Sequence, residues 1–200
     1  MHIEFLVDEE SKEAALKNLV PGIIGTNDFG IVIYQNLMGD LLRTLRAYRR
    51  WMPLDWKIVV LIDRDQKDCR ELKARLEEAA HTSGLSTKSS ARGQANFQVL
   101  NRLSIEELEA WFFGDPEAIH KAYPRIPANI SNKAAYRDAD AIRGGTWEAL
   151  QKELQRKNYY PGGLPKIEVA RNISGFMVPE RNRSRSFQVF RNGLLAIAAI

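Results

Sequence analysis

Two aspartates directly follow the most apolar strand-like stretch of the chain, and their spacing suits a metal ion. Residues 58–62 read Ile-Val-Val-Leu-Ile, a run typical of a strand that is buried on both faces. Asp63 and Asp65 therefore emerge at the carboxyl end of that strand, where open α/β sheets bind their ligands. Carboxylate oxygens favour Mg²⁺ or Mn²⁺. The alternative is a solvated turn in which Asp65 or Asp68 caps the next helix.

A second group of acids, Asp8, Glu9 and Glu10, follows a shorter apolar stretch at residues 3–7. If the strands at 3–7 and 58–62 are neighbours, these acids face Asp63 across the crevice at the edge of the sheet. Their ordinary role would be to occupy the first turn of a helix, where the helix dipole favours negative charge.

A third acid, Glu109, precedes Trp111 in an amphipathic segment. Ser104 and Glu107 have the spacing of a capping box, which predicts a helix from Ser104 to about Phe113. Glu109 lies at the margin of the apolar face of that helix. An acid in such a place is unusual unless it is paired or binds a ligand.

Basic residues form two groups, and the chain has a net charge of +4 and a pI near 9.2. Guanidinium groups pair bidentately with phosphate oxygens, so both groups suit a nucleic-acid backbone; the alternative is a solvated basic face. The first group is a helical stripe of four arginines, Arg43, Arg46, Arg49 and Arg50. The second, in the last third of the chain, is Lys166, Arg171, Arg181, Arg183 and Arg185.

The order of the expected elements indicates an α/β fold. Strands at about 3–7, 31–34, 58–62 and 97–100 alternate with helices, which favours a mostly parallel four-stranded sheet between helices. The chain after residue 115 reads as helical. We therefore expect an α/β domain over residues 1–114 and a helical extension over 115–200 that packs on it.

Several other classes of site and location lack support. There is no Walker A loop, no zinc-ligand spacing among the three histidines and no serine in a nucleophile elbow. Cys69 is the single cysteine, the start of the chain lacks the pattern of a signal peptide, and no apolar run is long enough to span a bilayer. These features predict a cytoplasmic protein without a membrane partner.

The acids and their surroundings resemble a known group of proteins. The segments at residues 5–11, 60–65 and 105–112, with Arg183-Ser184-Arg185-Ser186-Phe187, resemble a bacterial family of unknown function with a Toprim-like fold. That family is allied to RloB-like proteins and to the OLD-family Toprim nucleases. The first-strand glutamate of the family matches Asp8, and the glycine that normally follows it is Glu9 here.

The resemblance implies Mg²⁺- or Mn²⁺-dependent hydrolysis of DNA or RNA, in anti-phage defence. It implies that Asp63 and Asp65 hold metal, that Asp8 or Glu9 is a ligand or general base, and that Glu109 supports a second metal or orients water. Lys166 and the arginines near residue 183 would neutralise phosphate charge. A partner ATPase encoded nearby and a homo-oligomer are further expectations. The alternative is a nucleic-acid-binding or regulatory subunit with a degenerate Toprim site, which the change at Asp8 keeps open.

Overall fold

The computed structural model describes residues 1–91 and 96–199. Four parallel strands form its centre, in the order β2-β1-β3-β4. This arrangement confirms the predicted α/β class and the parallel sheet. The strands are β1 (His2–Val7), β2 (Asp28–Ile33), β3 (Trp56–Asp63) and β4 (Val99–Ser104).

The two central strands are buried because their side chains are apolar in both directions. Phe5, Val7 and Val59 belong to one apolar core, whereas Leu6 and Val60 belong to a second core on the opposite face of the sheet. Side chains alternate between the faces of a strand, so a continuous apolar run supplies both cores. The run at 58–62 therefore predicted the position of β3 correctly.

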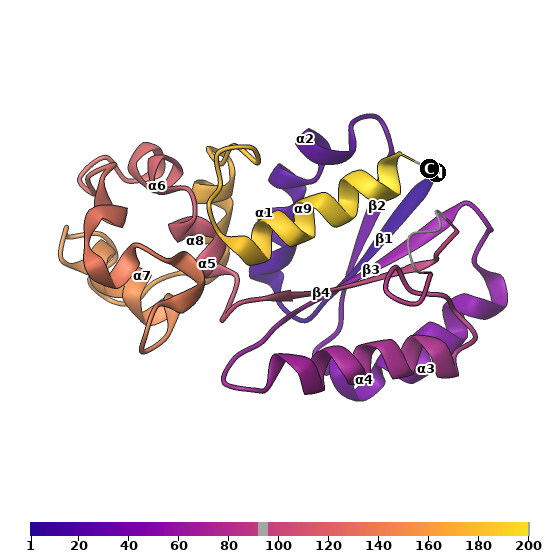
Figure 1. Cartoon of the computed structure of the whole chain (residues 1–200). Helices are drawn as coiled ribbons and strands as arrows, with labels where there is room; N and C mark the ends of the chain where they lie inside the picture. Colours follow the sequence, from indigo (N-terminus) through magenta and orange to yellow (C-terminus); the bar gives the residue numbers. More distant parts are fainter. Residues whose placement is uncertain (92–95, 200) are drawn as a thin grey trace.

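Helices cover both faces of the sheet (Figure 1). The first core is closed by α1 (Glu10–Leu19), α2 (Pro21–Ile24) and α9 (Arg185–Ala198). The second core is closed by α3 (Leu37–Trp51) and α4 (Cys69–Thr82).

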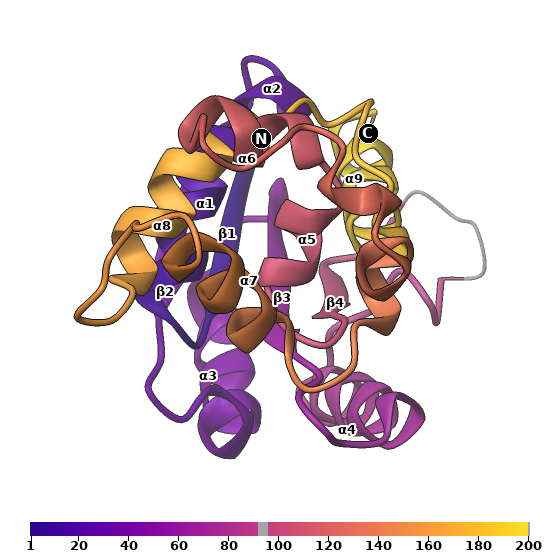
Figure 2. The ribbon, with the colours of Figure 1, turned by 90° about the vertical axis from the view of Figure 1, so that its left-hand side faces the viewer.

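The remaining helices gather at the carboxyl end of the sheet, which faces the viewer in Figure 2. Three single 3-10 turns lie at Ile130–Asn132, Ala134–Tyr136 and Ala139–Ala141. The helices are α5 (Glu109–Phe113), α6 (Pro116–Ala122), α7 (Thr146–Gln155) and α8 (Lys166–Ser174).

The last helix returns to the sheet from this group. Trp111 of α5 packs on Phe187 and Phe190 of α9, with ring centroids 5.2 and 4.8 Å apart. A Cβ atom at Gly193 would lie 2.8 Å from Leu100, so glycine is what lets α9 approach β4 closely. The first apolar core thus continues from the sheet into the helical part of the chain. A division into residues 1–114 and 115–200 stays a prediction.

The helix predicted from Ser104 is wrong at its start. β4 continues to Ser104, whose side chain is buried, and α5 begins only at Glu109. The capping-box spacing of Ser104 and Glu107 was therefore misleading, because pairing of β4 with β3 takes the chain through Ser104.

No described helix combines the length and apolar character needed to cross a membrane.

Candidate functional site

Asp8 and Asp63 lie side by side at the carboxyl edge of the sheet. β1 and β3 are parallel neighbours, with Val7 paired to Leu61. Asp63 is the last residue of β3, and Asp8 follows the last residue of β1. Asp8 therefore faces Asp63 across the edge of the sheet, as expected if these two strands are neighbours.

The ammonium group of Lys12 joins the two aspartates. Its Nζ lies 2.6 Å from Oδ1 of Asp8 and 2.8 Å from Oδ2 of Asp63. The Lys12 side chain has no exposed surface, whereas those of Asp8 and Asp63 are 30% and 9% exposed. We call these three residues the Lys12 triad. Lys12 was not among the residues expected from the sequence, although its position four residues after Asp8 has the spacing of a helical ion pair.

Burial and charge oppose each other in the Lys12 triad. Burial lowers the pKa of Lys12, but attraction to Asp63 and Asp8 outweighs burial and the net shift is upward. Burial raises the pKa of Asp63 to about 6, although Lys12 pulls it down. Lys12 is therefore charged and Asp63 largely ionised at neutral pH. Oδ1 of Asp63 is buried and has no hydrogen-bond partner among residues 1–91 and 96–199.

Glu109 is the third acid of the site. It begins α5 and is only 3% exposed. Burial raises its pKa to about 8, and the negative charge of Asp63 adds to that shift, whereas Lys166 opposes it. Glu109 is therefore mainly protonated at neutral pH, and a proton donor lies near Asp63.

Asp65 and Glu9 point to other partners. Asp65 adopts a left-handed backbone conformation with φ of 50°, is exposed, and lies 3.4 Å from Lys67 Nζ. The left-handed turn ends the strand geometry that would have placed Asp65 on the same side as Asp63. Glu9 accepts a hydrogen bond from the hydroxyl of Ser11 at 2.9 Å.

Two other acids have capping roles. Asp68 is the N-cap of α4 and accepts hydrogen bonds from the backbone N–H groups of Arg70 and Glu71. The alternative structural role for Asp68 is thus confirmed. Glu107 accepts hydrogen bonds from the Thr146 hydroxyl and the Trp147 backbone N–H at the start of α7.

The residues of the Lys12 triad do not fit a divalent metal ion as they are folded. Their carboxylates have suitable donor chemistry. However, the Lys12 ammonium occupies the place between Asp8 and Asp63 that such an ion would take. Within residues 1–91 and 96–199, no group of three His, Cys, Asp or Glu side chains is arranged to hold a metal.

The five basic residues expected to contact nucleic acid do not form one patch. Arg171 lies beside α1, Arg183 beside α6 and Arg185 beside α4. Lys166 is the member close to the acids, with Nζ 4.9 Å from the centroid of the Trp147 ring. Arg181 pairs bidentately with the fully buried Asp115, at 2.8 and 2.9 Å.

The arginines of α3 form a more continuous surface. Arg46, Arg49 and Arg50 are exposed, and in the described part of the chain they have no ion pair. Arg43 pairs with Asp40 at 2.9 Å. Trp51, which is 57% exposed, ends the same helix. We call Arg46, Arg49, Arg50 and Trp51 the α3 surface.

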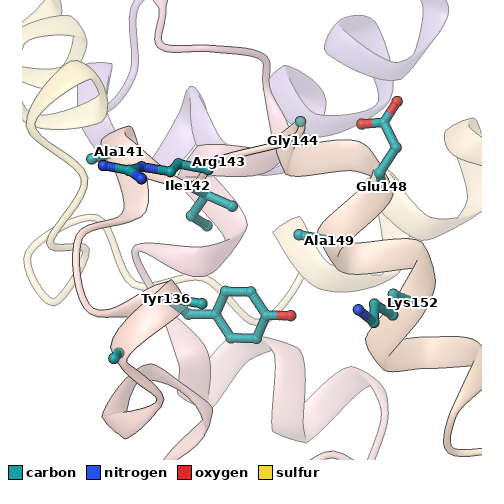
Figure 3. Close-up of a pocket in the computed structure, with 11 residues that line it drawn as sticks. Tyr136, Ala141, Ile142, Arg143, Gly144, Glu148, Ala149 and Lys152 are labelled. Carbon is teal, nitrogen blue, oxygen red and sulfur yellow. The ribbon is translucent and has the colours of Figure 1, made fainter.

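Cavities adjoin the carboxyl edge, but no member of the Lys12 triad lines the two that contain Arg143. One, of about 450 Å³, lies between α7 and the segment around residues 134–145, with Tyr136, Arg143, Glu148 and Lys152 in its wall (Figure 3). The other, of about 960 Å³, continues past Arg143 to the loops after β3 and β4. Its acidic side chains outnumber its basic ones, so a polyanion is not its natural ligand. The acids are Asp65, Glu106, Glu107, Asp140 and Glu148, and the bases are Arg64, Lys67 and Arg143.

Comparisons with known proteins agree with this architecture. Residues 7–195 match the family described as a domain of unknown function, DUF4276. The chain belongs to that family. No curated protein matches it significantly. Among solved structures it is similar to the C-terminal region of the Burkholderia pseudomallei OLD protein, with 16% identity and a TM-score of 0.50. That similarity covers 98% of this chain and 97% of the other, and at this identity it shows a shared fold.

Proposed function

We propose that this member of the DUF4276 family binds nucleic acid as a binding or regulatory protein with a degenerate Toprim-like site. The proposal rests on the observation that Lys12 forms ion pairs with both Asp8 and Asp63. The carboxylates best placed to hold a catalytic metal are thereby neutralised from within the protein.

The nucleic-acid part of the proposal rests on the resemblance to Toprim proteins and on the α3 surface. Arg46, Arg49 and Arg50 are exposed and unpaired among the described residues, so their guanidinium groups are available to phosphates. Trp51 at the end of α3 packs against Trp56 but stays 57% exposed, so part of its ring is available for a base to stack on. These contacts would give affinity with little sequence specificity.

A metal-dependent nuclease is the second candidate, and two observations favour it. Asp63 Oδ1 is buried and has no hydrogen-bond partner in the described part of the chain, and Glu109 is close enough for the charge of Asp63 to affect its pKa. Mg²⁺ or Mn²⁺ would have to displace Lys12 before Asp8, Glu9, Asp63 or Glu109 could act in hydrolysis. With either function, we propose that the protein acts in anti-phage defence in the cytoplasm, as a homo-oligomer and with a partner ATPase.

The test is to incubate labelled RNA and DNA with the wild type and with Asp63→Ala, in Mg²⁺ and then in Mn²⁺. We expect both proteins to bind at low salt, with affinity that falls as salt rises, and neither to cleave. Cleavage by the wild type that Asp63→Ala abolishes would establish the nuclease instead. Absent or salt-insensitive binding would contradict the proposal.

A further inference from the structure

A charged lysine in the interior of the Lys12 triad needs an explanation. Its side chain is fully buried, and its ammonium contacts carboxylates from two different elements, the end of β1 and the end of β3. Removing an ammonium from water is costly, and the cost is offset only when opposite charges hold it closely. Surface ion pairs of α1 such as Lys17–Glu13 have no such cost, since the Lys17 side chain is 62% exposed.

The position of Nζ is that of a small bound cation. Two carboxylate oxygens lie within 2.8 Å of it, at the edge where parallel sheets place their ligands. Mg²⁺ binds carboxylate oxygens at about 2.1 Å, so a small inward movement of the same two oxygens would suit an ion. Oδ1 of Asp63 is an additional buried oxygen to which no described residue donates a hydrogen bond.

We propose that Lys12 is a built-in cation that stands in the place of a divalent metal ion, so that removing its charge converts the Lys12 triad into a divalent-metal site. The inference deepens the proposed function, because it names the residue that keeps the site degenerate. It also means that one side chain, Lys12, determines whether this site can bind a divalent ion.

The decisive comparison is between Lys12→Gln and Lys17→Gln. Glutamine removes the charge and offers an amide oxygen as a ligand, and Lys17 is a matched control on the same helix. Mn²⁺ binding is measured by the loss of the free-ion electron paramagnetic resonance signal and by calorimetry. Lys12→Gln/Asp63→Asn tests whether the bound ion uses the expected oxygens.

We expect Lys12→Gln to bind Mn²⁺ at least about tenfold more tightly than the wild type, by analogy with the effect of neighbouring groups on metal sites. Lys17→Gln should behave as the wild type, and Asp63→Asn in the Lys12→Gln background should remove the gain. Asp63-dependent Mn²⁺ binding by the wild type would overturn the proposal, as would a Lys12→Gln variant that binds no more tightly than Lys17→Gln.

Failure of Lys12→Gln to fold would also be informative. In that event Lys12→Gln and Lys12→Glu are refolded with and without millimolar Mn²⁺ and followed by circular dichroism. Folding that depends on Mn²⁺ supports the proposal, since the ion then replaces the ammonium. If neither variant folds with Mn²⁺, the proposal is wrong. Nucleic-acid binding by the wild type is measured separately, so its absence would contradict the proposed function without affecting the metal comparison.

Discussion

A lysine side chain without exposed surface is uncommon, because an ammonium is strongly hydrated and is rarely fully buried unless it is paired. Lys12 meets that condition through Asp8 and Asp63, at 2.6 and 2.8 Å. The chemistry of the site therefore depends on Lys12, although nothing in the residues next to it in the sequence marks it as part of a site.

Without added metal, Lys12→Gln should lower the free energy of unfolding by about 3 kcal/mol, because two carboxylates lose their buried counter-charge. Lys17→Gln should change it by less than about 1 kcal/mol, since that ion pair is solvated. Urea denaturation of the two variants and the wild type measures both effects. Equal effects would show that Lys12 does not compensate the charges of the two aspartates.

Glu109→Gln should alter the pH dependence of stability. Burial raises the pKa of Glu109 from 4.5 to about 8 in the folded protein. Below pH 4.5 Glu109 is protonated in both the folded and the unfolded chain, so its ionisation does not change the free energy of unfolding. As pH rises towards 8, only the unfolded chain releases the proton readily, and the wild type loses stability.

The glutamine variant keeps a neutral side chain and avoids this loss. Between pH 4.5 and pH 8, the stability of the variant relative to the wild type should rise by roughly 3 kcal/mol. This is somewhat less than the full free energy that corresponds to the pKa shift of Glu109. Urea denaturation at several pH values measures the trend. A difference that does not change with pH would mean that Glu109 is already ionised in the folded protein.

At the scale of elements, Arg181 joins the segment before α9 to the start of α6 through ion pairs with Asp115 and Glu117. Asp115 is the N-cap of α6 and also accepts hydrogen bonds from the Val178 backbone N–H and from Arg181. The guanidinium of Arg181 is thus used in an internal ion pair, although the arginines around it in the sequence suggested phosphate binding. Arg183, two residues later, is exposed.

Arg181→Ala should therefore cost about 3 kcal/mol of stability, because it leaves a buried carboxylate without its partner. Arg183→Ala, a nearby exposed control, should stay within about 0.5 kcal/mol of the wild type. Thermal and urea denaturation give both values. If Arg183→Ala were the more damaging of the two, the assignment of Arg181 to the fold would be wrong.

At the scale of the whole molecule, the α3 surface and the acidic site lie on different parts of the protein. The α3 surface is on a helix that covers one face of the sheet, and the Lys12 triad is at the carboxyl edge (Figure 1). A nucleic acid held by α3 need not contact the acids, which suits a binding or regulatory role.

Neutralising the α3 surface should weaken nucleic-acid binding. The triple variant Arg46→Gln/Arg49→Gln/Arg50→Gln should reduce the slope of log affinity against log salt by about 2–3, roughly one for each phosphate contact. The matched triple variant Arg171→Gln/Arg183→Gln/Arg185→Gln removes the same charge from three separate places and should reduce it less. Fluorescence anisotropy over a salt series measures both slopes, and a larger loss in the second variant would place the interface there.

The local parts of this fold were predictable, because periodicity in the chain reflects which face of an element is buried. The strand at 58–62 follows that pattern and is present in the structure, and the chain after residue 115 is helical as expected. The region from Ser104 to Glu109 was not predictable in this way. Its short-range capping signal competed with strand pairing to β3, a contact between residues far apart in the chain.

The sequence by itself determined that this is an α/β protein and that Asp8 and Asp63 follow two of its strands. Only the tertiary structure decided that β1 and β3 are neighbours and that one buried ammonium bonds both acids. The physical reason is that side-chain type and spacing are local properties, whereas burial and the distance between charges depend on how distant segments pack. The same aspartates that suggested a bound metal ion are, in the folded protein, the partners of Lys12.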